Sequence, residues 1–93
     1  MDKRREAAMS YKVINVITAI DYIEEHLSEK LDLDIVANAV HYSKYHLHRT
    51  FTTSVGLTMH DYIKRRKLTE AAKLLVFSKK PIIEIALIAG YES

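Results

Sequence analysis

Apolar residues recur along most of the chain at the spacing of an α-helix, three or four positions apart. No alternation of apolar and polar residues typical of a β-strand persists for more than a few positions, and only two glycines and one proline interrupt the pattern. The pattern predicts five helices, over about residues 11–27, 33–40, 44–54, 59–77 and 82–89. We therefore expect an all-α protein.

The apolar positions also predict which side of each helix is buried. On the first helix the buried stripe consists of Val13, Val16, Ile17, Ile20, Ile23 and Leu27, and the polar side of Asn15, Thr18, Asp21, Glu24 and Glu25. The second helix follows the N-cap Asp32 and buries Ile35, Val36, Ala37, Ala39 and Val40. The fourth begins at the capping-box-like Thr58-x-x-Asp61 and buries Tyr62, Ile63, Leu68, Ala72 and Leu75.

The third predicted helix has two faces of different chemistry. Leu47 and Phe51 are the apolar anchors of one face, which also holds Thr50 and Ser54. The opposite face, at spacings of three, four and seven, carries Tyr45, His48, Arg49 and Thr52. This face has no acidic residue and offers hydrogen-bond donors, an aromatic ring and a guanidinium, which suits the major groove of DNA. With Ser43 to cap its start and Gly56 to end it, the segment is predicted to be a recognition helix.

Residues His41-Tyr42-Ser43 separate the second and third helices, which gives the helix-turn-helix order. Part of this order is repeated: Val36-Ala37 followed by His41-Tyr42 recurs 49 residues later as Ile85-Ala86 followed by Gly90-Tyr91. We therefore expect two tandem helix-turn-helix units. We expect residues 1–10 to be an N-terminal extension, 11–57 the first unit, 58–78 a linker helix, and 79–93 the start of a second unit that is cut before its recognition helix.

The net charge of +2 is by itself a poor argument for nucleic-acid binding, but the charges are unevenly distributed. Residues 44–80 carry nine Lys or Arg against Asp61 and Glu70, whereas the segments on either side are net negative. The positive charge therefore lies in the segment that holds the predicted recognition helix, as a phosphate-binding surface requires. A solvated face of an ordinary helical protein would give the same pattern, so the charge alone leaves both interpretations open.

The sequence carries no motif for catalysis, a cofactor or a metal. His46 and His48 are two residues apart and face different ways on a helix, there is no cysteine, and no His-Glu-x-x-His, glycine-rich phosphate loop or nucleophile motif occurs. We expect no enzyme, no metal and no cofactor. A charged N-terminus without an apolar segment after it, and the lack of a long apolar stretch, lead us to expect a cytoplasmic protein with no membrane partner.

Three motifs in order resemble the DNA-binding domain of AraC-type transcription regulators. They are Leu33 through Gly56, Tyr62-Ile63-x-x-Arg66-x-Leu68-x-x-Ala71, and Glu84-Ile85-Ala86-x3-Gly90-Tyr91-x-Ser93. The resemblance covers about residues 11–93. The sequence from Ser43 to Phe51 is most similar to the subgroup with an N-terminal DNA-binding domain. We therefore expect no N-terminal sensor domain on this chain. The chain departs from the family at position 41, where His replaces the usual Gly, and at the missing second recognition helix.

The resemblance implies two helix-turn-helix units joined by a long central helix. It also implies that Tyr45, His48 and Arg49 face the bases, the same positions that helical geometry selects, and that flanking residues touch phosphates. We assign that second role to Ser43, Lys44, Thr52, Thr53, Lys64 and Arg65. The expected partners are double-stranded DNA and, for the full-length protein, RNA polymerase. Because the segment 81–93 is rich in apolar residues, we expect it either to fray after about Lys80 or to associate with another copy of the chain.

The leading hypothesis is a sequence-specific DNA-binding module of a bacterial-type transcription regulator, which reads the major groove with the helix at about 44–54. One alternative is a helical protein-interaction module with a basic face for an acidic partner. Another is a cationic amphipathic surface for anionic membranes, based on Lys64 to Lys67.

Overall fold

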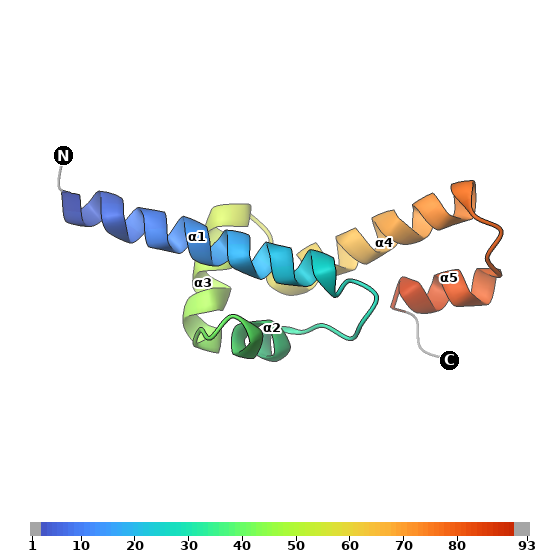
Figure 1. The fold of residues 1–93 in the computed structure, drawn as a ribbon, viewed down its shortest axis with the longest axis horizontal. Coiled ribbons are helices and arrows are strands. Elements are labelled where there is room, and N and C mark those ends of the chain that lie inside the picture. The colour runs from blue at the N-terminus through green and yellow to red at the C-terminus, as the bar shows by residue number, and fades with distance from the viewer. Residues whose placement is uncertain (1–2, 91–93) are drawn as a thin grey trace.

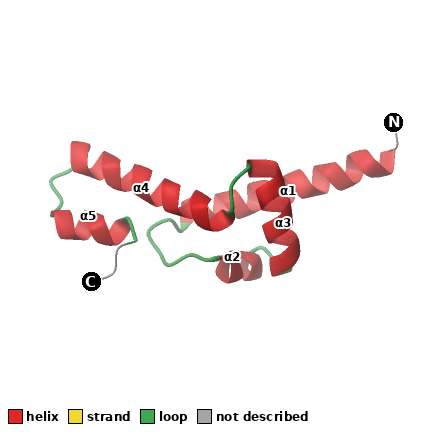
Figure 2. Cartoon of the chain, turned by 180° about the vertical axis from the view of Figure 1, so that it is seen from behind, coloured by secondary structure: helices red, strands yellow, loops and turns green. Residues whose placement is uncertain are grey.

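The computed structural model describes residues 3–90, with side chains described from residue 13 onward. This part of the chain consists of helices and loops without a strand (Figure 2). The helices are α1 (Lys3–Glu25), α2 (Leu33–Ala39), α3 (Lys44–Val55), α4 (Met59–Phe77) and α5 (Ile82–Ile88). The predicted all-α class is confirmed, and the last four helices begin at the predicted positions. Tyr91, assigned by the sequence to the turn after the last helix, lies outside the described residues.

The first helix begins at Lys3 rather than near Tyr11. The prediction was wrong because it placed the start just before the apolar periodicity, whose first residue is Val13. The preceding residues contain no Gly or Pro and are mostly Lys, Arg, Ala, Glu and Met, which favour a helix without any buried stripe. The helix therefore continues into the segment expected to be an N-terminal extension.

The molecule is elongated and has two parts (Figure 1). Helices α1, α2 and α3 pack together, while α4 leads away from them and α5 folds back along α4. The molecule extends 55 × 23 × 18 Å, and its radius of gyration is 15.7 Å. A compact chain of this length would have a radius of gyration of about 12 Å. We call the three-helix part the first unit, and α4 with α5 the arm. Among the described residues, no helix is both long and apolar enough to cross a membrane.

The main hydrophobic core lies in the first unit and takes in the start of α4. It consists of Val16, Ala19, Ile23, Val36, Ala37, Leu47, Phe51, Met59 and Ile63. Phe51 is fully buried, and its ring meets that of Tyr62 edge-on with 5.5 Å between centroids. Leu47 and Phe51 are core residues as predicted.

Part of the predicted stripe on α1 is exposed. Val13 and Ile17 are about half exposed, because α2 and α3 lie on one side of α1, centred on Val16, Ala19 and Ile23. Ala19, which the prediction left out, is fully buried. On α2, Ala39 is exposed, while Val36 and Ala37 are buried.

The predicted inner face of α4 is also partly wrong. Leu68, Ala72 and Leu75 are exposed, whereas Met59, Ile63 and Ala71 are buried. The reason is that different neighbours cover the two ends of α4. The first unit covers its start, and α5 covers the side that carries Ala71, where a small side chain lets two helices approach closely. Ala71 of α4 and Ile85 of α5 are both buried, but neither belongs to the main core.

The internal repeat appears in the structure as two short helices of equal length, because α5 begins and ends 49 residues after α2. Each is followed by a residue in the left-handed region, His41 with φ 60° and Gly90 with φ 94°. After α2, the backbone N–H of His41 donates to the oxygen of Asn38 (3.4 Å) and that of Tyr42 to Ala37 (2.9 Å), the pattern of a Schellman motif. Histidine therefore occupies a backbone conformation that favours glycine.

We expect Leu47→Ala to lower the free energy of unfolding by about 2–5 kcal/mol, because it leaves a cavity in the main core. Leu75→Ala is the matched control, since the same atoms are removed from a side chain that is 58% exposed rather than 2%. This control should change stability by less than about 1 kcal/mol. Urea unfolding followed by circular dichroism measures both, and equal losses would show that we have misassigned the buried faces.

We expect His41→Gly to raise the free energy of unfolding by roughly 0.5–1 kcal/mol. Relief of a left-handed non-glycine residue outweighs the extra backbone entropy that glycine loses on folding. The control is His41→Ala, which removes the same imidazole but keeps the unfavourable φ. If the two variants melt at the same temperature, the backbone at position 41 is not strained.

Candidate nucleic-acid interface

The turn between α2 and α3 is tied to α1 by Tyr42. Its hydroxyl donates a hydrogen bond to Asn15 Oδ1, and both side chains are half-buried. This pair is not predicted from the sequence, in which Asn15 belongs to the polar side of the first helix. The two residues are 27 positions apart, and neither shows a local signal for the contact. The bond fixes where α3 begins relative to α1.

Both ends of α3 are defined by side-chain and backbone caps. Ser43 Oγ accepts a hydrogen bond from the backbone N–H of His46 at 3.2 Å. At the other end, Gly56 has φ 82°, and its N–H donates to the backbone oxygen of Thr52 at 2.9 Å. With its ends capped and Leu47 and Phe51 buried, α3 is held with one face toward solvent.

The three residues predicted to contact bases lie on this exposed face. Tyr45 is 67% exposed, and His48 and Arg49 are also exposed. The Tyr45 ring stands edge-on to His46, with 5.9 Å between the ring centroids. Arg49 forms no ion pair with any residue between 13 and 90, so its guanidinium donors are available to an external acceptor.

The residues that flank this face differ in how available they are. Lys44 Nζ lies 3.2 Å from the carboxylate of Asp34 on α2, in an exposed pair worth about 0–1 kcal/mol. Thr53 is exposed and donates its hydroxyl to the backbone oxygen of Arg49 at 2.8 Å. Ser43 is exposed beside the start of α3.

The predicted placement of Thr52 on the outer face is wrong for its hydroxyl. The Oγ1 atom is buried and has no hydrogen-bond partner among the described residues. Helical spacing gives the direction of a side chain but not what covers it, and a threonine hydroxyl lies close to its own helix. Thr52 therefore does not present its hydroxyl to a phosphate in this structure.

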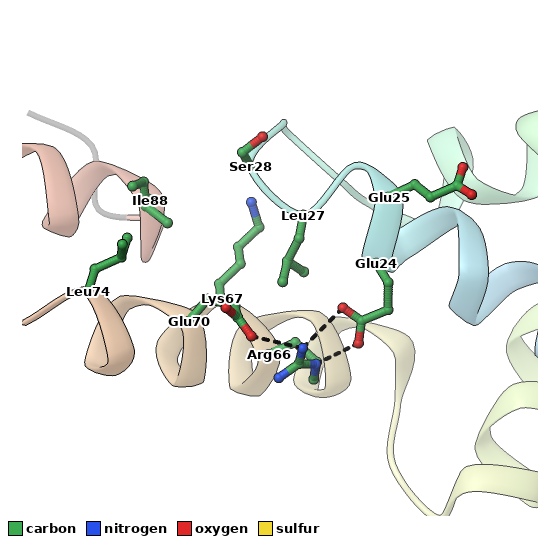
Figure 3. Close-up of a pocket in the computed structure, with 9 residues that line it drawn as sticks. All are labelled: Glu24, Glu25, Leu27, Ser28, Arg66, Lys67, Glu70, Leu74 and Ile88. Atoms are coloured by element: carbon green, nitrogen blue, oxygen red, sulfur yellow. Dashed lines mark hydrogen bonds and ion pairs between the residues drawn. The ribbon is translucent and has the colours of Figure 1, made fainter. Parts of the chain in front are cut away.

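The basic run from Lys64 to Lys67 divides between two sides of α4. Lys64 and Arg65 are exposed and form no ion pair with the described residues. Arg66 and Lys67 point instead toward the end of α1, where Arg66 pairs with Glu24 and Lys67 approaches the loop after α1 (Figure 3). Within this run, the two residues predicted to touch phosphates, Lys64 and Arg65, are therefore the two that remain exposed.

The electrostatics of Arg66 follow from its partners. Hydrogen bonding to Glu24 raises the pKa of Arg66 above its ordinary value, and the same contact lowers the pKa of the Glu24 carboxyl despite its partial burial. Partial burial lowers the pKa of Lys67. The charge of Arg66 is thus neutralised within the molecule, whereas Arg49 has no ion-pair partner among residues 13–90.

Comparisons with known proteins agree with this geometry. A family model described as a helix-turn-helix domain matches residues 36–93. Regulatory protein SoxS of Salmonella typhimurium is 40% identical over 85 residues, which cover 91% of this chain and 78% of SoxS. Multiple antibiotic resistance protein MarA of the same organism is 39% identical over 80 residues, covering 86% of this chain and 63% of MarA.

A solved structure shows the same fold. It is a transcriptional regulator with an AraC-type DNA-binding domain from Chromobacterium violaceum, and it superposes with a TM-score of 0.79 at 27% sequence identity. The match covers 90% of this chain and 75% of the other. Family model, relatives and fold agree, and the chain belongs to the AraC-type family of helix-turn-helix domains, which bind DNA sequence-specifically in transcription regulators.

Proposed function

We propose that the chain reads DNA by placing α3 in the major groove, with Tyr45, His48 and Arg49 on the base edges. The observation that supports this most directly is the exposed outer face of α3, which has no acidic residue and carries an unpaired Arg49. Arg49 is suited to the O6 and N7 acceptors of guanine. His48 can donate to or accept from a base edge, and Tyr45 can pack on a thymine methyl group or a sugar.

We also propose which residues hold the phosphates. Ser43, Lys44 and Thr53 flank the outer face of α3, and Lys64 and Arg65 add exposed charge on α4. Lys44 has to exchange Asp34 for a phosphate, and the weak exposed pair makes this exchange inexpensive. Thr52 is omitted because its hydroxyl is buried. Phosphate contacts supply affinity and salt dependence, whereas the residues on the base edges supply sequence preference.

At the level of the whole regulator, we propose that the protein works in the cytoplasm together with RNA polymerase. The family assignment disfavours the other hypothesis from the sequence, a protein-interaction module with a basic face. The two differ in one measurable respect, because an acidic protein partner requires no preference for one DNA sequence over another.

For Arg49→Ala we expect a loss of about 1–3 kcal/mol in binding to a preferred duplex, with little loss on random duplex. The preferred duplex is first selected from a random pool with the unaltered chain, and affinities are then measured by fluorescence anisotropy over a salt series. The control is Arg65→Ala, which should weaken binding to both duplexes alike and reduce the salt dependence. If the chain selects no sequence, the interaction module is favoured; equal loss on both duplexes would make Arg49 a phosphate contact.

We further propose that the chain associates with a second copy through the apolar surface of α5. Ile83 and Leu87 are 68% and 54% exposed. The repeat gives these exposures a meaning, because the residues 49 positions earlier on α2 are Asp34 and Asn38, which are polar and exposed. The two positions that are polar and exposed on α2 are therefore apolar and exposed on α5. An exposed apolar surface of this kind favours contact with a partner.

Sedimentation velocity over a concentration series should show a concentration-dependent dimer. The double variant Ile83→Asp with Leu87→Asn, which gives α5 the residues of α2, should remain monomeric. Val13→Asp is a control that places a charge on the exposed side of α1 and should not prevent dimerisation. An unaltered chain that stays monomeric at all concentrations would disprove self-association.

A further inference from the structure

The hydrophobic packing of the molecule is interrupted where the arm leaves the first unit. Met59 and Ile63 at the start of α4 belong to the main core, and the next buried residue along α4 is Ala71, which lies outside it. Between Ile63 and Ala71 no side chain of α4 is buried. Apolar packing therefore does not determine the direction of α4 over these two turns.

A network of charged side chains occupies this interval instead. The Glu24 carboxylate accepts two hydrogen bonds from Arg66, from Nε at 2.6 Å and from Nη2 at 3.2 Å. Tyr62 donates its hydroxyl to the same carboxylate at 3.3 Å. Arg66 Nη2 also donates to Glu70 Oε1 at 3.1 Å, so one guanidinium connects the end of α1 to two turns of α4 (Figure 3).

The geometry of this contact is more restrictive than that of the other ion pairs. A two-point contact between a planar guanidinium and a carboxylate fixes orientation as well as distance. The Arg66 and Glu24 side chains are 28% and 35% exposed, against 59% and 63% for Lys44 and Asp34. A second contact lies one residue on, where Lys67 Nζ donates to the backbone oxygen of Glu29 at 2.7 Å.

An open groove lies beside this network, between the end of α1 and the two helices of the arm (Figure 3). Its apolar walls are Leu27 of the loop after α1, Leu74 of α4 and Ile88 of α5. All three side chains are only partly buried. A rotation of α4 about its start would narrow or widen this groove without breaking the main core, so the charged contacts are what oppose such a rotation.

We infer that Arg66 is a positioning residue, which by bridging Glu24 and Glu70 fixes the angle at which the arm leaves the first unit. The angle matters because α4 has 19 residues and is about 28 Å long. A rotation of about 10° at its start displaces its far end by about 5 Å. Since successive segments of a major groove lie about 34 Å apart, the direction of α4 decides where α5 lies relative to a duplex held by α3. This last consequence rests on the proposed function.

The absence of cysteine in the sequence allows a direct test by spin labelling. Asp21→Cys on α1 and Lys79→Cys after α4 are exposed positions without side-chain hydrogen bonds or ion pairs to other described residues. In this background, Arg66→Met should at least double the width of the distance distribution measured by double electron–electron resonance. The matched control Arg65→Met removes a neighbouring, exposed arginine and should leave the width unchanged. An Arg66→Met width equal to that of the unaltered chain overturns the proposal.

Three further variants separate positioning from general destabilisation. Glu24→Gln should also broaden the distribution, because an amide offers one acceptor oxygen where the carboxylate offers two. The double variant Glu24→Gln with Arg66→Met should be no broader than Arg66→Met alone, because both substitutions act on the same contact. Arg66→Lys keeps the charge without the planar fork and should give an intermediate width. Additive broadening by the two substitutions would show that they act separately and would contradict the bridge.

Binding to a short duplex that covers only the segment read by α3 separates this inference from the proposed function. Arg66→Met should bind it with unchanged affinity and unchanged salt dependence, because α3 and its flanking residues are intact. Weaker binding with a reduced salt dependence would make Arg66 a phosphate contact and overturn its positioning role. If even the unaltered chain shows no sequence preference, the proposed function fails while the spin-label result still decides the role of Arg66.

Discussion

The burial of Phe51 and Leu47 in the main core determines how the rest of the first unit is arranged. These two side chains hold α3 against α1, α2 and the start of α4, and they leave only one side of the helix free. The position of Arg49 and Tyr45 toward solvent is a consequence of what lies on the opposite side. The face of α3 proposed to read DNA thus depends on apolar contacts on the opposite side of the helix, because those contacts set the rotation of α3 about its own axis.

Where one helix supplies both core residues and an exposed face, helical spacing predicts both. Leu47, Phe51, Tyr45 and Arg49 are all correctly placed by the sequence of α3, and so are its caps at Ser43 and Gly56. The left-handed backbone at His41 was also foreseeable, because the repeat aligns His41 with Gly90. The outcome for Thr52 shows the limit of this reasoning, because burial of a single hydroxyl depends on neighbours that the helical angle does not describe.

Other features depend on which helices meet, and no local pattern specifies that. Val13 and Leu75 belong to regular apolar stripes yet lie in solvent, because no described helix covers them. The bond from Tyr42 to Asn15 and the bridge from Arg66 to Glu24 join residues far apart in the sequence. In the run from Lys64 to Lys67, the sequence shows that the four charges cannot share one side of α4. Only the structure shows that Arg66 and Lys67 donate hydrogen bonds to Glu24 and to the Glu29 backbone oxygen.

The separation of the two buried clusters bears on how this kind of protein can change over evolution. Ala71 and Ile85 are packed apart from the core that orients α3, and polar contacts lie between. Substitutions in one part therefore need few compensating changes in the other, because strain is transmitted mainly through close-packed apolar contacts. The first unit and the arm can then accumulate substitutions independently, as long as the residues that join them, Glu24 and Arg66, are retained.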